Sequence, residues 1–260
     1  MNGNNKGDLI MTALANLSNG AIHAVNSAFK AKRSMDGSLA RLSTGIRTLY
    51  GNDSAGQAVA SNITTQARSA DVAARNAEDG ISFLQAAENV LFEMASLNTR
   101  LRELAVQKNN GILSTADKAA IEAEENEIVA AGEKIGNSQL NNRDLLSTFS
   151  IAINNHGTLS HLGAVVKPVL ASGVSNSDTQ MANISKALGQ IAAGINALKG
   201  HQSNMYSLSA NARAAASRIQ DTDFAKESAN LAQNSILNQS ALAMVAQANN
   251  AQAYILTLLN

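Results

Sequence analysis

Cysteine and tryptophan are absent from this chain of 260 residues, and proline occurs once, as Pro168. Without cysteine the chain has no disulfide, no thiolate nucleophile and no thiolate zinc site. With a single proline, the commonest breaker of helices is nearly missing. Aromatic residues make up only 3% of the chain, whereas hydrophobic residues make up 45%. The apolar side chains are therefore mainly Ala, Leu, Ile and Val, which suit thin contacts between helices better than a thick globular core.

The chain also has no excess charge and no long apolar run. Its 20 basic and 20 acidic side chains give a formal net charge of +0, so the composition does not indicate binding to nucleic acid or to an anionic membrane. No apolar run approaches the roughly 18 residues of a membrane-spanning helix. Leu9–Ala15 is short and is interrupted by Thr12, which argues against the core of a signal peptide. If the protein leaves the cell, we expect a route that needs no cleaved leader.

Apolar residues recur at helical spacing near both ends of the chain. In the stretch from Leu14 to Leu49 the mean interval is about 3.5 residues, the value typical of a coiled coil. Many of these residues are alanines, which bury little surface. Because such helices are marginal without partners, we predict that the two ends pair with each other and with further copies of the chain. The predicted seam residues are Leu14, Leu17, Met35, Leu39, Leu42, Ile46, Leu231, Leu242, Val245, Ile255 and Leu259.

The first half of the middle region is predicted to be helical. A turn at Gly51–Gly56 is followed by a helical pattern that runs to about Lys108. Ser114 and Asp117 have the spacing of a capping box, which predicts a second helix from Asp117 to about Ser138.

One segment of the middle region has the periodicity of a strand. Phe149–Ile153 alternates apolar residues with small or polar ones, Asn154–Gly157 supplies a turn, and Thr158–Val166 is expected to return as the second strand. Together they predict a small β-hairpin.

The segment after the hairpin is small and polar. Val169–Thr179 is predicted to be a loop, and Ser177 or Asp178 is expected to cap a helix that runs to about Ala216. The last helix is predicted to span Phe224 to Leu259.

No pattern in the sequence supports catalysis or cofactor binding. The phosphate-cradling glycine loop, the nucleophile motif Gly-x-Ser-x-Gly and the zinc motif His-Glu-x-x-His are all missing. Across the predicted hairpin, His156 and His161 form either a chelating pair or a solvent-exposed pair, and we favour the second. We therefore assign no catalytic, cofactor-binding or metal-binding residue, and an enzyme is the class with the least support.

Several short segments resemble one protein family in both sequence and order. They are Arg41–Arg47 (RLSTGIR), Asp53–Gly56 (DSAG), Arg75–Ser82 (RNAEDGIS), Arg102–Gln107 (RELAVQ), Ser217–Ala225 (SRIQDTDFA) and Ala246–Asn249 (AQAN). With these segments the chain resembles bacterial flagellin over most of its length. A soluble coiled-coil adaptor of fixed oligomer size and the hook–filament junction protein of the flagellum are the alternatives, and the last two segments favour flagellin.

The resemblance implies a mainly α fold. It consists of a long α-helical coiled-coil rod with paired N- and C-terminal helices and one small β-hairpin. Residues 12–54 and 219–260 would be the paired helices that line the inner tube of a filament. Residues 55–218 would be the helical rod domain, with the hairpin near 149–166. Outer domains are not expected, because few residues separate the two halves of the rod. Residues 1–11 form an extension before the point where the family usually starts.

The resemblance also implies two sets of surface residues. Inter-subunit or junction contacts would be made by Arg41, Arg47, Asp53, Arg75, Arg218, Asp221 and Asp223. A surface that faces an animal innate-immune receptor in many flagellins would include Arg100, Leu104 and Glu124. For both sets the alternative is an ordinary solvated helix surface, on which an ion pair contributes ~0–1 kcal/mol.

The function that the resemblance implies is that of a structural subunit. The chain would be secreted and would polymerise into the flagellar filament, which transmits motor rotation as thrust. Its partners would be further copies of itself, the flagellar cap, the hook–filament junction proteins, an export chaperone and the flagellar type III export apparatus.

Overall fold

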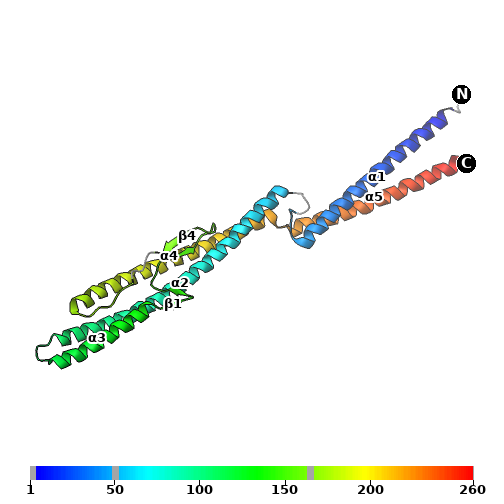
Figure 1. Cartoon of the computed structure of the whole chain (residues 1–260). Helices are drawn as coiled ribbons and strands as arrows, with labels where there is room; N and C mark the ends of the chain where they lie inside the picture. Colours follow the sequence, from blue (N-terminus) through cyan, green and yellow to red (C-terminus); the bar gives the residue numbers. More distant parts are fainter. Residues whose placement is uncertain (1–3, 49–52, 163–166, 260) are drawn as a thin grey trace. The chain divides into compact units, whose positions relative to one another are not determined.

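The computed structural model describes residues 4–48, 53–162 and 167–259, with side chains except at 4–11, 13–14, 16–17, 159–162, 256 and 258–259. Within these ranges the chain is 81% helical, which confirms the predicted mainly α fold. The long helices are α1 (Asn4–Thr44), α2 (Ser54–Lys108), α3 (Thr115–Gly136), α4 (Val174–Gln220) and α5 (Phe224–Leu259). The strands are β1 (Gln139–Leu140), β2 (Arg143–Asp144), β3 (Phe149–Ala152) and β4 (Leu159–Leu162), paired as β1–β2 and β3–β4 (Figure 1).

The chain divides into two compact units. The first contains residues 1–61 and 216–260, and the second contains residues 62–215. Each boundary falls inside a helix, α2 in one case and α4 in the other. The sequence placed the division a few residues away, at 54/55 and 218/219. Which unit lines a tube and which forms a rod stays a prediction.

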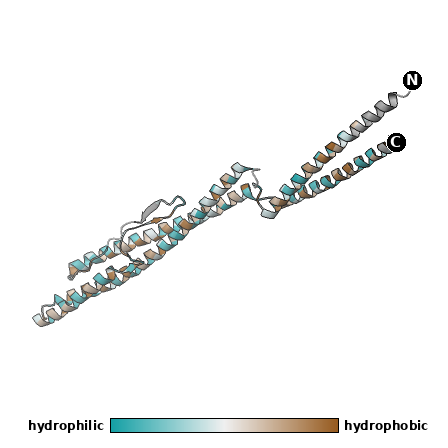
Figure 2. Cartoon of the chain, turned by 45° about the vertical axis from the view of Figure 1, so that its right-hand side comes forward, coloured by the Kyte–Doolittle hydropathy of each residue, from teal (hydrophilic) through white to brown (hydrophobic). Residues whose placement is uncertain are grey.

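In the first unit α1 and α5 lie side by side along a contact made of small residues (Figures 1 and 2). The buried residues of this contact include Ala24, Ala28 and Ala31 of α1 and Ala241 of α5. The side-chain amide of Asn238 donates a hydrogen bond of 2.9 Å to the carbonyl oxygen of Ala28. Alanine lets two helices approach closely, but each methyl group removes little apolar surface from water. The pair is therefore close but weakly stabilised.

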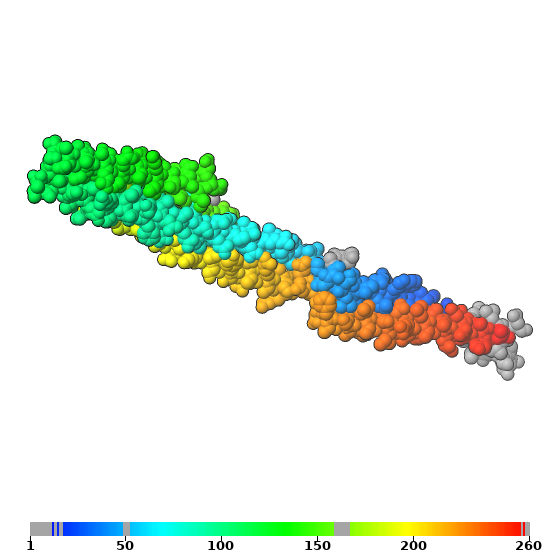
Figure 3. All heavy atoms as spheres, turned by 90° about the horizontal axis from the view of Figure 1, so that it is seen from below, coloured from blue at the N-terminus to red at the C-terminus, as the bar shows by residue number. Residues whose placement is uncertain are grey.

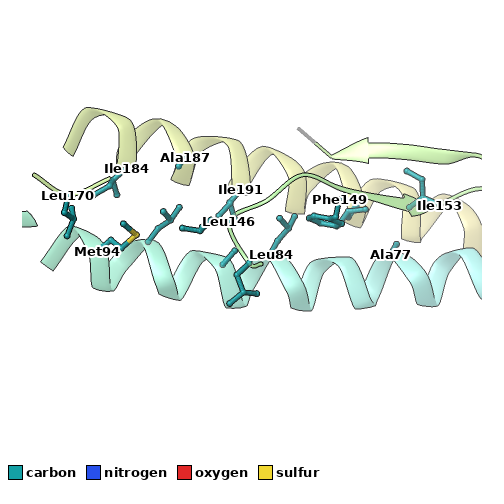
Figure 4. Packing of buried hydrophobic residues seen from close by; sticks show 14 of the residues in the cluster. Ala77, Leu84, Met94, Leu146, Phe149, Ile153, Leu170, Ile184, Ala187 and Ile191 are labelled. Carbon is teal, nitrogen blue, oxygen red and sulfur yellow. The ribbon is translucent and has the colours of Figure 1, made fainter. Parts of the chain in front are cut away.

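The second unit has a core of larger side chains. Leu84 and Met94 of α2 face Ile184 and other residues of α4 (Figure 4). Leu91 of α2 belongs to the same cluster. Leu145 and Leu146 before β3, Phe149 at its start and Ile153 just after it complete this core. Figure 3 shows the spheres of α3 lying alongside those of α2. The interior of this unit therefore contains larger apolar side chains than the contact between α1 and α5.

The hairpin β3–β4 approaches the helices closely because α2 has a glycine beneath it. A Cβ atom at Gly80 would lie 2.9 Å from Cδ1 of Leu198, and it would also overlap the end of the Ile151 side chain. Asn76 of α2 donates a hydrogen bond of 2.9 Å to the carbonyl oxygen of Ala152. The ring of Phe149 on β3 packs against that of Phe83 on α2, with centroids 4.8 Å apart.

Several local predictions are confirmed. α2 ends at Lys108, and β3 begins at Phe149. Ser114 and Asp117 form the predicted capping box, with the Asp117 amide 3.2 Å from Oγ of Ser114 and the Ser114 amide 3.0 Å from Oδ2 of Asp117. The turn between β3 and β4 contains Gly157 at a positive φ of 72°, a conformation that glycine adopts at little cost.

Two helix ends differ from the predictions. α1 ends at Thr44, because Gly45 adopts a φ of 71° and its amide bonds to the carbonyl oxygen of Arg41 at 2.8 Å. This is a left-handed helix cap, so Ile46 lies beyond the helix and is not part of its seam. α4 begins at Val174, so the predicted loop is shorter than expected. Ser177 lies buried in the first turns of α4 and is not its cap.

The hairpin β1–β2 was not predicted. Its two-residue turn consists of Asn141 and Asn142, with φ values of 52° and 60°. Two positive φ angles in a two-residue turn are typical of type I′, and asparagine tolerates them better than most residues. The two adjacent asparagines are a local signal for a turn, but they do not indicate the short strands around it.

We expect the core of the second unit to respond strongly to truncation. Leu91 is fully buried, whereas its neighbour Phe92 is 55% exposed. Leu91→Ala should lower the free energy of unfolding of this unit by about 2–5 kcal/mol, because it leaves a cavity. Phe92→Ala should change it by only about 0.5 kcal/mol. Urea denaturation followed by circular dichroism measures both, and equal effects would contradict the core assignment.

Candidate assembly site

Backbone hydrogen bonds join the segment that follows α1 to the end of α4 and the link between α4 and α5. We call this cluster, Gly45–Thr48 and Ile219–Asp223, the junction. The Arg47 amide donates to the carbonyl oxygen of Gln220 at 2.7 Å, and the Thr222 amide donates to that of Gly45 at 2.9 Å. Ile46 and Asp221 thereby form an isolated antiparallel bridge. Two segments that are far apart in sequence are thus held together at the base of the α1–α5 pair.

Arg47 binds two other chain segments through its side chain. One guanidinium nitrogen, Nη2, lies 2.7 Å from the carbonyl oxygen of Ile219 in the last turn of α4 and 3.2 Å from Oδ2 of Asp53. Carbonyl groups at the end of a helix lack intrahelical partners, so a cation there is favourable. Arg47 therefore connects the end of α4 to the start of α2.

Asp53 caps α2. Its Oδ1 accepts a hydrogen bond of 2.8 Å from the Gly56 amide, as expected for an acidic residue before the first helical turn. This backbone hydrogen bond, followed by the hydrogen bond and charge of Arg47, lowers the pKa of the Asp53 carboxyl group. The carboxylate is exposed enough to remain solvated, so its role here is to fix the beginning of the helix.

Asp223 caps α5 in the same way. Its Oδ1 accepts hydrogen bonds from the amides of Ala225 at 3.0 Å and Lys226 at 3.1 Å. One turn further along, Oε1 of Glu227 lies 2.6 Å from Nη2 of Arg41 on α1. The Arg41 hydrogen bond, before all other causes, lowers the pKa of Glu227, which is only 8% exposed. This ion pair ties the two terminal helices together.

The sequence predicted most of these charges but missed Glu227. Recognising the Arg41–Glu227 pair requires the register between α1 and α5, and no spacing within either helix gives that register. Among the predicted charges, Arg41, Arg47, Asp53, Asp221 and Asp223 lie in or beside the junction.

Two predicted contact residues lie apart from these pairs. Arg218 is exposed on the last turn of α4. Arg75 is exposed on α2 in the second unit, where its charge acts on Asp71 and Tyr206, and it does not join the junction.

The predicted seam residues of the first unit divide into three groups. Met35, Leu42, Leu231, Val245 and Ile255 are partly buried, whereas Leu39 and Leu242 are 59% and 54% exposed. The side chains of Leu14, Leu17 and Leu259 lie outside the described residues. The seam is thus only partly covered within one chain.

A groove of about 470 Å³ runs between α1 and α5. Val25, Phe29, Met35, Leu242 and Val245 are among the apolar residues that line it. Lys32 and Asp36 lie at its border. Grooves of this composition accept apolar side chains.

The first unit exposes further large apolar residues that the seam prediction did not include. They are Ile22, Phe29, Phe224, Ile236, Leu237, Met244 and Tyr254, each more than half exposed. The sequence contained a signal for them, because apolar residues of α5 also occur between the positions of the predicted seam. A helix that is apolar on several faces is usually covered by more than one neighbour.

The proposed receptor surface is only partly a surface. Nη2 of Arg100 on α2 lies 2.7 Å from Oε1 of Glu124 on α3, and both side chains are about half exposed. Leu104 is 1% exposed and belongs to the interior between these helices. The expectation that Leu104 lies on this surface is therefore wrong for the folded chain.

Among the described side chains, no group of three or more His, Asp or Glu residues is placed to hold a metal ion. The side chain of His161 lies outside the described residues. In the described part of the chain, no helix is long and apolar enough to cross a bilayer.

Comparison with known proteins identifies both halves of the chain. The bacterial flagellin N-terminal helical region matches residues 16–150, and the bacterial flagellin C-terminal helical region matches residues 174–259. A flagellin of Halalkalibacterium halodurans is 35% identical over 243 residues, covering 84% of this chain and 89% of that protein.

Other relatives give the same result. The flagellar filament 33 kDa core protein of Treponema phagedenis is 31% identical over 266 residues, covering 87% of this chain and 92% of its own length. The flagellin of Bacillus subtilis is 27% identical over 297 residues, covering 92% and 97%. Since the family regions match most of the chain and the relatives are covered almost completely, this chain belongs to the bacterial flagellin family.

Proposed function

We propose that this chain is a structural subunit that polymerises into the bacterial flagellar filament and transmits motor rotation as thrust. Family membership supports a filament component, and nothing in the comparisons favours the hook–filament junction protein. The observation that carries the proposal is the contrast between the alanine contact inside the first unit and the large apolar side chains on its outside. We propose no enzymatic role.

The energetic argument concerns the first unit alone. Burying a Leu, Phe or Met side chain contributes about 1.5–3 kcal/mol, whereas a buried CH₂ contributes ~0.8 kcal/mol. The contact between α1 and α5 uses mainly alanine, while Phe29, Leu39 and Leu242 remain more than half exposed. These three large side chains therefore still have apolar surface available for burial after the pair has formed. Neighbouring copies of the chain would complete that burial.

Order in the terminal helices would then depend on assembly. A helix pair with few large buried side chains is marginal by itself, and the cost of ordering it can be met at the moment of binding. The second unit has its own core and would be folded in the monomer. The growing filament would thus add a chain whose second unit is preformed and whose terminal helices settle as they join.

The junction would couple the ordering of α1 and α5 to the end of α4 and the start of α2. Arg47 contacts the end of α4 and the cap of α2, and Arg41 contacts Glu227 of α5. Because these charges are already paired within the chain, we propose a positioning role for them. Arg218 is exposed, which makes it the better candidate for a contact with a neighbouring subunit.

The route to the filament and the remaining partners are also part of the proposal. The chain has no cysteine, so no disulfide hinders passage of an unfolded chain through a narrow channel. By family resemblance we propose secretion through the flagellar type III export apparatus with an export chaperone. The filament cap and the hook–filament junction proteins would be neighbours in the flagellum. Arg100 and Glu124 are proposed to contribute to a surface for an animal innate-immune receptor.

The groove side of α5 provides the sharpest test of the assembly proposal. Leu242→Asp places a charge on a residue that is exposed in the single chain, so the monomer should keep its helix content. In the polymer the charge would be buried without a partner, which costs several kcal/mol. We expect soluble monomer and no filaments when seeds are added, as seen by electron microscopy.

Gln233→Asp introduces the same charge at an exposed polar position of α5 and serves as the control. We expect it to polymerise. Normal filaments from Leu242→Asp, or an equal loss in both variants, would refute the assignment of this face. Val245→Asp should abolish assembly too, but it will also disturb the monomer, because Val245 is partly buried.

The Arg41–Glu227 pair predicts a pH dependence. Because the pKa of Glu227 in the folded chain lies below its ordinary value of 4.5, the pair stabilises folding above that value. The stabilisation is lost as the pH falls through the lower folded pKa. Acidification to about pH 3 should therefore loosen the α1–α5 pair, seen by circular dichroism as reduced helix content.

Glu227→Gln removes the titrating group, so the first unit of this variant should be less stable near neutral pH and less sensitive to acid. Glu124→Gln is the matched control, since Glu124 pairs with Arg100 at an exposed position of the second unit. Identical acid titrations for wild type and Glu227→Gln would contradict the role assigned to the pair.

A further inference from the structure

The loop between α2 and α3 contains a reactive dipeptide. Asn110 is followed by Gly111, and both are exposed. The next residue, Ile112, is 93% exposed. Apart from atoms of Gly111 and the residues on either side of it, no described heavy atom lies within 4 Å of the position that a Cβ of Gly111 would occupy. The peptide between Asn110 and Gly111 is thus open to solvent and free of side-chain obstruction.

The side chain of Asn110 is held over this peptide. Its Oδ1 accepts a hydrogen bond of 3.2 Å from the Ile112 amide, which makes an Asx turn that folds the side chain back on the following residue. A donor at Oδ1 also draws electron density from Cγ. The carboxamide carbon is therefore both close to the backbone of Gly111 and activated toward a nucleophile.

We propose that Asn110 is a site of spontaneous deamidation in the folded chain. The peptide nitrogen of Gly111 loses its proton to solvent and attacks Cγ of Asn110. A new N–C bond forms, the bond from Cγ to the side-chain nitrogen breaks, and ammonia leaves after taking up a proton. Water then adds to either carbonyl of the cyclic imide and opens it. The products are aspartate and isoaspartate, and no oxidant or reductant is involved.

Glycine at position 111 matters for steric reasons. With no Cβ it lets the backbone turn toward the conformation that cyclisation needs, which most other residues disfavour. Asn109 is exposed in the same loop, but Asn110 follows it and carries a full side chain. Asn109 is therefore a control within the same peptide. Gly20 also follows an asparagine, Asn19, but both lie inside α1. Because we propose that the order of α1 depends on assembly, this pair is less suitable than Asn109 as a control.

The reaction would change the loop in two ways. The formal net charge of the chain is +0, so each conversion leaves it with one extra negative charge. Isoaspartate also lengthens the backbone by one atom. The hydrogen bond of 3.3 Å from the Leu113 amide to the carbonyl oxygen of Asn110 would not survive this insertion in its present geometry. The loop just before the Ser114 cap of α3 would therefore be altered.

The test is incubation of the purified full-length chain in mildly alkaline buffer, with peptide mapping by tandem mass spectrometry over several days. We expect the replacement of the side-chain amide by a hydroxyl group at Asn110, with isoaspartate present, several-fold faster than at Asn109. The rate should rise with pH, because the deprotonated peptide nitrogen is the nucleophile. Ion-exchange chromatography should show acidic forms, and the peptide map assigns each of them to an asparagine.

Two further measurements separate the folded loop from the bare dipeptide. Gly111→Ala should slow the conversion several-fold while helix content stays unchanged. The same chain in urea gives the rate for an unfolded Asn-Gly pair, and the folded chain should convert at a comparable or higher rate. The proposal is overturned if Asn110 converts no faster than Asn109, if Gly111→Ala has no effect, or if folding suppresses the reaction many-fold.

Discussion

The contact between α1 and α5 is built from alanine, and the behaviour of the first unit depends on that choice. Small residues allow two helices to lie close together, with Asn238 bonded directly to a backbone carbonyl of α1. Larger side chains such as Phe29, Leu39 and Leu242 remain more than half exposed in the single chain. A leucine contact between α1 and α5 would stabilise the terminal helices in the monomer. It would also leave less apolar surface for contacts with neighbouring copies.

The junction compensates for this weak contact at one place. Backbone hydrogen bonds between residues 45–47 and 220–222, the caps at Asp53 and Asp223, and the two arginines concentrate directional bonds at the base of the helix pair. Directional bonds fix register, which a smooth alanine surface does not. The second unit needs no such device, because its interior is formed by large side chains from α2, α4 and the segment around β3.

Much of the fold was predictable from local patterns. The end of α2, the capping box at Ser114 and the hairpin at Phe149 each depend on residues that are close in sequence. The errors have local causes as well. Gly45 ends α1 although apolar periodicity continues past it, and α4 begins before the polar residues that were expected to cap it. The pairing of Glu227 was beyond reach, since it depends on which residue of α1 lies opposite.

The sequence by itself determined the helical class, the end of α2, the extent of α5, the absence of disulfides and, through its ordered motifs, the family. These properties follow from hydrogen bonds and side-chain spacing within a few turns of chain. Only the tertiary structure decided the register of α1 against α5, the partners of Arg41 and Arg47, and which apolar residues remain exposed. The register and the contacts of Arg41 with Glu227 and of Arg47 with Ile219 join residues more than a hundred positions apart. A helical repeat permits many such alignments with nearly equal local energy.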